Sequence, residues 1–593
     1  MKKTGYPSID KPWKKYYTNA DISEEEVKKR IEKSMFQMLD ECTENIEDRI
    51  AIEYYGQQIT YNEFKKRIYE CAKSFLQLGV KPKDIVPLIL PNQPESRISI
   101  YALNLIGATA YPIQPSVSSK QLNQIIYENN IKNLVLFRGF YRQYKVQIEE
   151  VENVIYTTAK ESLPKAIQKL DDISHIRPSK VIPYTDFILE STSYKGIITP
   201  VYEKNTTAAI IGTSGTTGTP EGTCLSNENL NAMALQHLLG EMDLEVGDIL
   251  LNILIDSIGY GLGTMHYSGC CGFKSILIPE LVTDVAPLFL KYHPQHFTGG
   301  PIHAENLEKF LKNPKNKHKI EELRKIIYEE VKNWVSGGAP LKSTTEDFLN
   351  QEKILIRQGL GCTENGGAAT FTKQGTYKKG SVGIPLMLET MSIFEQGTDK
   401  ELKYHEKGEI CITGPTVMQE YLNNPEETEH TIKIHKDGKR WIHTGDEGYM
   451  DEDGNVYITG RYKKMTHRLG FNIHPQTIAD DLSKAKLEHV NDYHIIALPH
   501  PKEQNVPVAF ISVEPNANIN KIKKELMQFA EENLSKYDIP YDYVFIIGNL
   551  PRNIGGKIDD AKLLEAVKIN YEQQEIPKYP IIALEQKTKK KRK

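Results

Sequence analysis

Residues 208–222 have the sequence AAIIGTSGTTGTPEG, in which an apolar run leads into a loop of small residues. The apolar run is typical of a buried strand. Glycines in the loop let the backbone approach an anion closely, and hydroxyl side chains add hydrogen-bond donors. We therefore expect a strand, a tight phosphate-binding loop, and then a helix that begins near Asn227. The small residues of the loop are Gly212, Thr213, Ser214, Gly215, Thr216, Thr217 and Gly218.

Strand-like and helix-like segments alternate on both sides of this loop. Thr60 and Glu63 have the spacing of a capping box, and apolar residues then recur at helical spacing until Gly79. This alternation predicts α/β layers that contain much parallel sheet. Apolar runs typical of buried strands lie at residues 84–90, 133–137, 153–158, 206–211, 248–255 and 274–279.

The chain of 593 residues is too long for one compact core. After residue 464 the pattern changes to shorter, charge-rich α+β segments. The predicted fold class is α/β, with a large multi-layered N-terminal domain of mixed sheets and a smaller mobile α+β C-terminal domain. The expected parts are an N-terminal extension that ends in a docking helix (1–44), the large domain (45–460), a hinge (461–464), the small domain (465–572) and a basic tail (573–593).

Composition and charge indicate which classes of binding partner are not expected. The formal charge of −4 gives no general attraction to nucleic acid or membranes. The longest nearly apolar run, 101–113, is shorter than the about 20 residues of a membrane span. The seven cysteines form no C-x-x-C pair, so we expect reduced thiols in a cytoplasmic protein. The basic end, 587–593, is expected to be a solvated tail, with weak binding to an anionic surface as the alternative.

Four more stretches follow the glycine-rich loop in order: SGGAPL at 336–341, QGLGCTENGG at 358–367, WIHTGDEGYMDEDGNVYITGRYKK at 441–464 and LPRNIGGKID at 550–559. With these stretches the chain resembles the adenylate-forming superfamily, which includes acyl-CoA synthetases, luciferases and peptide-synthetase adenylation domains. The resemblance extends from about residue 45 to about residue 570.

The resemblance implies an ATP- and Mg²⁺-dependent acid–thiol ligase. Such enzymes join a carboxylic acid to AMP, release pyrophosphate, and usually pass the acyl group to a thiol, for which coenzyme A is expected here. Three alternatives stay open. The acceptor could be the phosphopantetheine thiol of a carrier protein, the acid could be an amino acid whose amine pairs with Asp256, or the chain could be a catalytically impaired nucleotide-binding homologue. The identity of the acid and the oligomeric state are not predicted.

The resemblance also implies roles for individual residues. Lys557 would be the adenylation lysine on a mobile loop, and Thr363 would contact phosphate. Glu364 would hold Mg²⁺ together with Thr217, because carboxylate and hydroxyl oxygens suit that hard cation. Lys463 would be the hinge. The nucleotide would be bound by Thr213, Ser214, Gly215, Thr216, Thr217, Gly218, Gly337, Gly338, Ala339, Pro340, Gly361, Asp446 and Arg461.

Glu221 departs from the family pattern, which usually has a lysine at this position of the loop. A carboxylate about 6 Å from a phosphate charge would cost about 3 kcal/mol per charge pair at an effective dielectric of about 20. We therefore expect Glu221 to turn to solvent and to slow adenylation without abolishing it. The other departures are Leu360 at an adenine-stacking position, Ile258 at a gate position, and Thr477 and Asp560 in the C-terminal part.

Glycines are frequent in the segments expected to form the acyl pocket. They suggest room for a bulky or long acyl group, although glycine also serves backbone turns. These glycines are Gly299, Gly300, Gly337, Gly338, Gly366 and Gly367.

Overall fold

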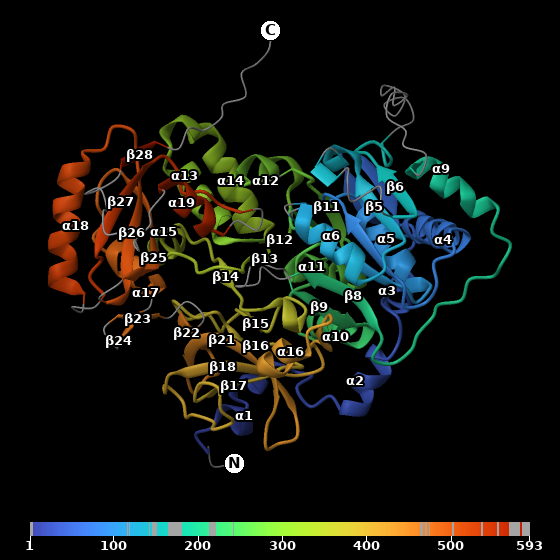
Figure 1. Ribbon diagram of the computed structural model, residues 1–593, viewed down its shortest axis with the longest axis horizontal. Helices are drawn as coiled ribbons and strands as arrows, with labels where there is room; N and C mark the ends of the chain where they lie inside the picture. The colour runs from blue at the N-terminus through green and yellow to red at the C-terminus, as the bar shows by residue number, and fades with distance from the viewer. Residues whose placement is uncertain are drawn as a thin grey trace, which may run out of the picture. The chain divides into compact units, whose positions relative to one another are not determined.

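The chain divides into two compact units, which are described separately (Figure 1). Unit 1 comprises Met1–Glu406, Cys411–Thr444 and Met450–Tyr457, and unit 2 comprises Lys407–Ile410, Gly445–Tyr449 and Ile458–Lys593. The computed structural model describes residues 4–115, 117, 119–141, 143–144, 151–163, 181–212, 221–240, 242–280, 282–462, 466–468, 471–473, 475–500, 503–534, 538–553, 557–567 and 581–583.

Unit 1 contains an eight-stranded sheet that carries the glycine-rich loop between two of its strands. Its order is β19 (Glu420–Tyr421), β9 (Gly222–Ser226), β8 (Thr207–Gly212), β4 (Thr109–Pro112), β3 (Ile85–Ile89), β5 (Asn133–Phe137), β6 (Asn153–Thr157) and β7 (Val181–Pro183). The strands from β8 to β7 pair in parallel, whereas β9 and β19 are antiparallel additions. Its helices are α4 (Tyr61–Gln77), α5 (Pro94–Leu105), α6 (Ser119–Glu128), α9 (Tyr184–Leu189) and α10 (Asn227–Leu239).

The expected order of strand, loop and helix is wrong at one point. Strand β9 lies between the loop and helix α10, and it pairs with β8 from Gly212↔Gly222 outward. All five residues of β9 are buried, and the backbone of this segment pairs with β8 instead of forming a helix. The loop therefore joins two antiparallel strands. The helix follows only after Ser226, whose hydroxyl accepts the Asn229 N–H as the N-cap.

A second, seven-stranded sheet is parallel except at one edge. Its order is β14 (Arg357–Gln358), β13 (Asn333–Ser336), β12 (His296–Gly299), β10 (Ile249–Asn252), β11 (Lys274–Leu277), β1 (Ile50–Tyr54) and β2 (Gln57–Thr60), with β2 antiparallel. The helices in its connections are α11 (Gly259–Cys270), α12 (Ala286–Tyr292), α13 (Pro301–Lys312), α14 (Lys317–Glu329) and α15 (Ser343–Gln351). Phe289, Phe297 and Trp334 pack ring against ring in the core of this layer.

A smaller β region follows in the chain. Its main sheet contains β17 (Thr390–Phe394), β18 (Gly408–Thr413), β21 (Arg440–Met450), β20 (Ile432–Ile434) and β22 (Val456–Arg461), and β15 (Thr370–Phe371) pairs with β16 (Ile384–Pro385). The short helix α16 (Pro425–Thr431) precedes β20.

The N-terminal extension folds onto unit 1. Its helices are α1 (Pro7–Asp10), α2 (Glu24–Ile31) and α3 (Met35–Thr43). Helix α3 is hydrogen-bonded to the rest of unit 1: the Met35 N–H donates to the Asn227 side chain at 2.9 Å, and the Phe36 N–H donates to the Asn104 side chain at 3.0 Å.

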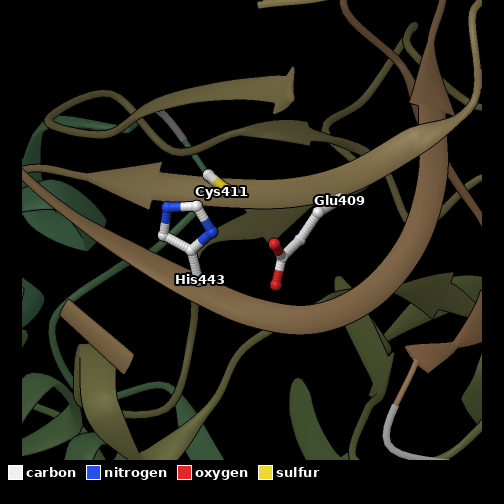
Figure 2. Close-up of side chains that lie close together, drawn as sticks. All are labelled: Glu409, Cys411 and His443. Atoms are coloured by element: carbon white, nitrogen blue, oxygen red, sulfur yellow. The ribbon is translucent and has the colours of Figure 1, made fainter. Parts of the chain in front are cut away.

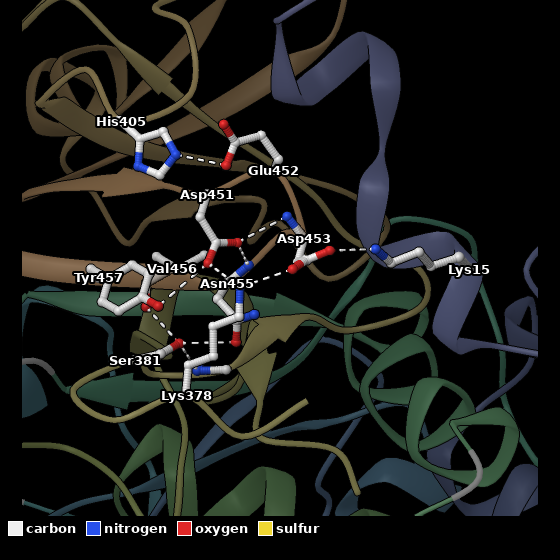
Figure 3. Close-up of polar contacts among 11 residues, drawn as sticks. Lys15, Lys378, Ser381, His405, Asp451, Glu452, Asp453, Asn455, Val456 and Tyr457 are labelled. Atoms are coloured by element: carbon white, nitrogen blue, oxygen red, sulfur yellow. Dashed lines mark hydrogen bonds and ion pairs between the residues drawn. The ribbon is translucent and has the colours of Figure 1, made fainter. Parts of the chain in front are cut away.

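Ion pairs fasten the start of the extension to the turn between β21 and β22 (Figure 3). The Lys15 ammonium lies 2.6 Å from the Asp453 carboxylate. Lys378 bridges the same carboxylate at 2.9 Å and Asp451 at 2.7 Å. Hydrogen bonds from the two lysines lower the pKa of Asp453 to about 2. The N-terminal segment is thus an integral part of unit 1.

Unit 2 has a sheet with a separate core on each face. The sheet contains β24 (Phe471–Ile473), β23 (Thr466–Arg468), β26 (Gln504–Val513), β27 (Asp542–Ile547), β28 (Ile581–Ala583) and β25 (Val490–His500), and the helices are α17 (Pro475–Ser483), α18 (Ile519–Asn533) and α19 (Asp560–Val567). Alternate residues of β26 face opposite sides: Ile511 packs with α17 and α18, whereas Phe510 packs with α19.

The predicted α/β fold class, with a large domain of mixed sheets and a small C-terminal domain, is confirmed. In the part of the chain that the structure describes, no helix has the length and apolar character needed to cross a membrane.

Candidate active site

The carboxyl edge of the seven-stranded sheet brings two of the predicted stretches together. Parallel strands place the loops that follow them at one edge, where α/β proteins commonly bind ligands. Ser336 at the end of β13 pairs with Gln358 of β14, and the Gly359 N–H donates to the Ser336 carbonyl at 3.2 Å. The loop with Gly337, Gly338, Ala339 and Pro340 therefore starts beside the loop with Gly361, Thr363 and Glu364.

Close backbone packing explains most of the glycines in this region. A Cβ added to Gly367 would lie 2.7 Å from the Gly259 carbonyl oxygen, and one added to Gly361 would lie 2.2 Å from the Gly367 carbonyl oxygen. A Cβ on Gly299 would meet the His303 ring at 2.7 Å. Gly367 lets its loop touch helix α11, and Gly361 lets the same loop fold back on itself. Gly299 makes room for the His303 ring, so these three glycines do not widen a pocket.

Of the six glycines, Gly338 borders open space, whereas a Cβ added to Gly300 or Gly366 would make only ordinary van der Waals contacts at 3.8 Å. A Cβ on Gly338 would have no described atom within 4 Å. The expectation of room for a large acyl group is therefore supported by open space at Gly338, whereas Gly299 and Gly367 are tightly packed.

Glu364, the expected magnesium ligand, is held at two points. It lies in a 3₁₀ turn (Thr363–Asn365), and its Oε1 accepts the Tyr421 hydroxyl at 2.6 Å. Its backbone carbonyl accepts the Met418 N–H at 2.8 Å. Tyr421 is 3% exposed, and burial and the neighbouring carboxylate raise the pKa of its hydroxyl. Sequence reasoning missed Tyr421, because a single aromatic residue in an irregular segment carries no periodic signal.

Several predicted residues lie outside the described part of the chain. They are Thr213, Ser214, Gly215, Thr216, Thr217 and Gly218 of the phosphate loop and the hinge residue Lys463. Glu221 is described and is half-buried directly before β9. Its expected turn toward solvent remains a prediction.

Within unit 2, Asp446 and Arg461 form an ion pair. Their strands β21 and β22 are neighbours, and the Arg461 Nε lies 3.1 Å from an Asp446 oxygen. Gly445 has a φ of 72°, a left-handed conformation that suits glycine, and its N–H donates to Glu409 at 3.0 Å. The turn and the arginine together orient the Asp446 carboxylate.

Lys557 is exposed at the end of a small hairpin in unit 2. Its N–H donates to the Asn553 side chain at 3.0 Å, and the Asn553 N–H donates back to the Lys557 carbonyl at 2.8 Å. Arg552 bridges to Ile558 and forms an ion pair with Asp492 at 2.9 Å. The base of the hairpin is thereby fixed, with the lysine at its exposed end.

The structure also places the residues that depart from the family pattern. Leu360 is buried, and Ile258 precedes helix α11. The Thr477 hydroxyl donates to the Thr459 carbonyl at 3.0 Å, and Asp560 lies 2.7 Å from the His494 ring at the start of α19. Both C-terminal departures therefore have local partners within unit 2.

Asp256 is buried beside an internal cation. It is 2% exposed, accepts the Ser96 hydroxyl at 2.8 Å, and lies 3.8 Å from Arg97. Burial raises the pKa of Asp256, whereas the charge of Arg97 lowers it. Because the charge is already balanced, the geometry disfavours the suggested pairing of Asp256 with a substrate amine.

One group of possible metal ligands lies on strands β18 and β21 (Figure 2). Ligand atoms of Glu409, Cys411 and His443 are within 4.8 Å of one another. Glu409 accepts the Gly445 N–H, and His443 hydrogen-bonds His435 at 2.9 Å. Cys411 packs with aromatic rings in a small core. These interactions give each side chain a role in the β region.

Comparisons with known proteins agree with this arrangement. The family model of the AMP-binding enzyme matches residues 39–422, and that of the AMP-binding enzyme C-terminal domain matches residues 485–557. A long-chain-fatty-acid–CoA ligase of Bacillus subtilis (strain 168) is 27% identical over 582 residues, which cover 95% of this chain and 99% of the relative. A probable 4-coumarate–CoA ligase 1 of Dictyostelium discoideum is 27% identical over 519 residues, which cover 84% of this chain and 90% of the relative.

A solved structure shares the fold. The crystal structure of ATP-bound MatB from Rhodopseudomonas palustris superposes with a TM-score of 0.75 and 22% identity, covering 90% of this chain and 99% of that one. The chain belongs to the AMP-binding enzyme family.

Proposed function

We propose that this chain adenylates a carboxylic acid with ATP and Mg²⁺ and transfers the acyl group to coenzyme A. The observation that carries the proposal is the edge of the seven-stranded sheet, where the loop of residues 337–340 starts beside the loop that contains Thr363 and Glu364. Similarity over nearly the full length to CoA ligases supports the same reading.

The donor set at Glu364 fits Mg²⁺. This cation prefers oxygen ligands and binds commonly through one or two carboxylates together with phosphates. Glu364, with the Thr217 hydroxyl, would hold it, and the Tyr421 hydroxyl on Oε1 orients the carboxylate. Bound there, Mg²⁺ would neutralise charge on the triphosphate.

The chain's own residues would then offset the remaining repulsion. The Lys557 ammonium would lie between the acid carboxylate and the α-phosphate, where negative charge accumulates. Asp446 would accept the ribose hydroxyls, with Arg461 keeping its carboxylate in place. The carboxylate oxygen attacks the α-phosphorus and pyrophosphate leaves. The thiol sulfur then attacks the acyl carbon and AMP leaves.

For the acid we propose a fatty acid first and an aryl acid second. Named relatives of these two kinds align over 95% and 84% of the chain, respectively. The open space beside Gly338 is compatible with either acid.

Acid-dependent release of pyrophosphate tests the proposal. The purified protein, ATP and Mg²⁺ are incubated with fatty, aryl and amino acids, and pyrophosphate and AMP are measured. We expect release with at least one fatty or aryl acid, and thioester formation with free coenzyme A. Silence across the whole panel would contradict the proposal. Acyl transfer to a carrier protein but not to coenzyme A would show that the proposed acceptor is wrong, and the proposed adenylation step would stand.

A further inference from the structure

Tyr421 joins the expected magnesium ligand to the strand that follows the phosphate loop. Its hydroxyl donates to Glu364 Oε1 at 2.6 Å. It lies on β19, where it pairs with Thr223 of β9. Next to it, the Leu422 N–H donates to the Gly222 carbonyl at 2.7 Å. The hydroxyl thus has a fixed position relative to the end of the loop.

The hydroxyl acts on the carboxylate rather than on the backbone of Glu364. The backbone carbonyl of Glu364 already accepts the Met418 N–H. Without the hydroxyl, the carboxylate could rotate, and cation binding would have to restrict that rotation. Hydrogen bonds to metal-ligating carboxylates commonly set ligand orientation in this way.

We propose that Tyr421 is a positioning residue for the magnesium–ATP complex, which fixes the Glu364 carboxylate relative to strand β9. The inference rests on the proposed function, because it requires Glu364 to bind the cation.

The test compares Tyr421→Phe with Tyr202→Phe. Tyr202 is a matched control, because its hydroxyl donates to a carboxylate, that of Glu228, at the same 2.6 Å in the same unit but outside the predicted site. ATP binding is measured by calorimetry at graded Mg²⁺ concentrations and in EDTA. For Tyr421→Phe we expect the Mg²⁺ concentration that half-saturates ATP binding to rise about 10-fold or more. Binding in EDTA should not change, and Tyr202→Phe should behave as the wild type.

A wild-type Mg²⁺ dependence in Tyr421→Phe would overturn the inference, as would an equal shift in both variants. If the wild type itself shows no Mg²⁺-dependent ATP binding, the proposed function fails first, so the two failures are distinguishable. A Glu364→Gln background provides a second test that does not depend on the stability of one variant. There the added Tyr421→Phe change should have little further effect, and a full additional loss would show that Tyr421 does not act through Glu364.

Discussion

Gly367→Ala should damage unit 1 more than another glycine substitution with similar backbone strain. Gly367 has a φ of 108°, and a new Cβ would lie 2.7 Å from the Gly259 carbonyl oxygen and 2.8 Å from the Tyr260 Cα. Backbone atoms cannot move aside as a flexible side chain can. Gly375 in the same unit has a φ of 79°, but its Cβ position has no described atom within 4 Å.

The two costs can be separated by magnitude. A left-handed conformation costs a residue other than glycine about 1–2 kcal/mol. Overpacking adds about 1–3 kcal/mol. Gly375→Ala should therefore destabilise by about 1–2 kcal/mol, and Gly367→Ala by about 2–5 kcal/mol.

Tryptophan fluorescence in urea measures this difference. Trp13, Trp334 and Trp441 are the three tryptophans of the chain, and all are buried in unit 1. We expect a lower urea midpoint for Gly367→Ala than for Gly375→Ala. Adenylation should fall with it, because the Gly259 end of helix α11 also packs on Thr363. Equal midpoints for the two variants would refute the close contact between helix α11 and the loop.

Three further predictions concern single charges. Lys557→Ala should lower acid-dependent pyrophosphate exchange by at least about 100-fold while ATP still binds, and an unchanged exchange rate would refute the role of this lysine. Glu221→Lys should raise turnover by less than about tenfold if the carboxylate faces solvent. A fall in turnover would contradict the hypothesis that Glu221 slows adenylation. Burial raises the pKa of Glu95 to about 7 from 4.5, so the stability of the folded chain falls as the pH rises through that interval. Relative to the wild type, Glu95→Gln should therefore raise the urea midpoint more at pH 8 than at pH 5, and the opposite order would contradict the raised pKa.

Periodic segments were predictable from the sequence. Helix α4 begins after its N-cap Thr60, whose side chain accepts the Glu63 N–H, and it ends before Gly79. Strands β5 and β6 also lie at the apolar runs 133–137 and 153–158 that were expected to form strands. In these segments one local pattern fixes both the element and the face that it buries.

Features that depend on distant partners were not predictable. Strand β9 has only five residues, and its pairing with β8 decides its conformation. The glycines near α11 suggested open space, but the approach of Gly259 to Gly367 is a tertiary contact. Asp256 likewise meets Arg97 from helix α5, far away in the sequence. Of the candidate site, the motif residues could be proposed from the sequence, whereas Tyr421 required the fold.

The central claim is that an acid oxygen attacks the α-phosphorus of ATP, and labelled oxygen tests it most directly. The acid is labelled with ¹⁸O in its carboxylate, and the products with ATP, Mg²⁺ and coenzyme A are analysed by mass spectrometry. A single labelled oxygen in AMP, with unlabelled pyrophosphate, is the predicted result. Label in phosphate with release of ADP, or AMP without label, would contradict formation of an acyl-adenylate.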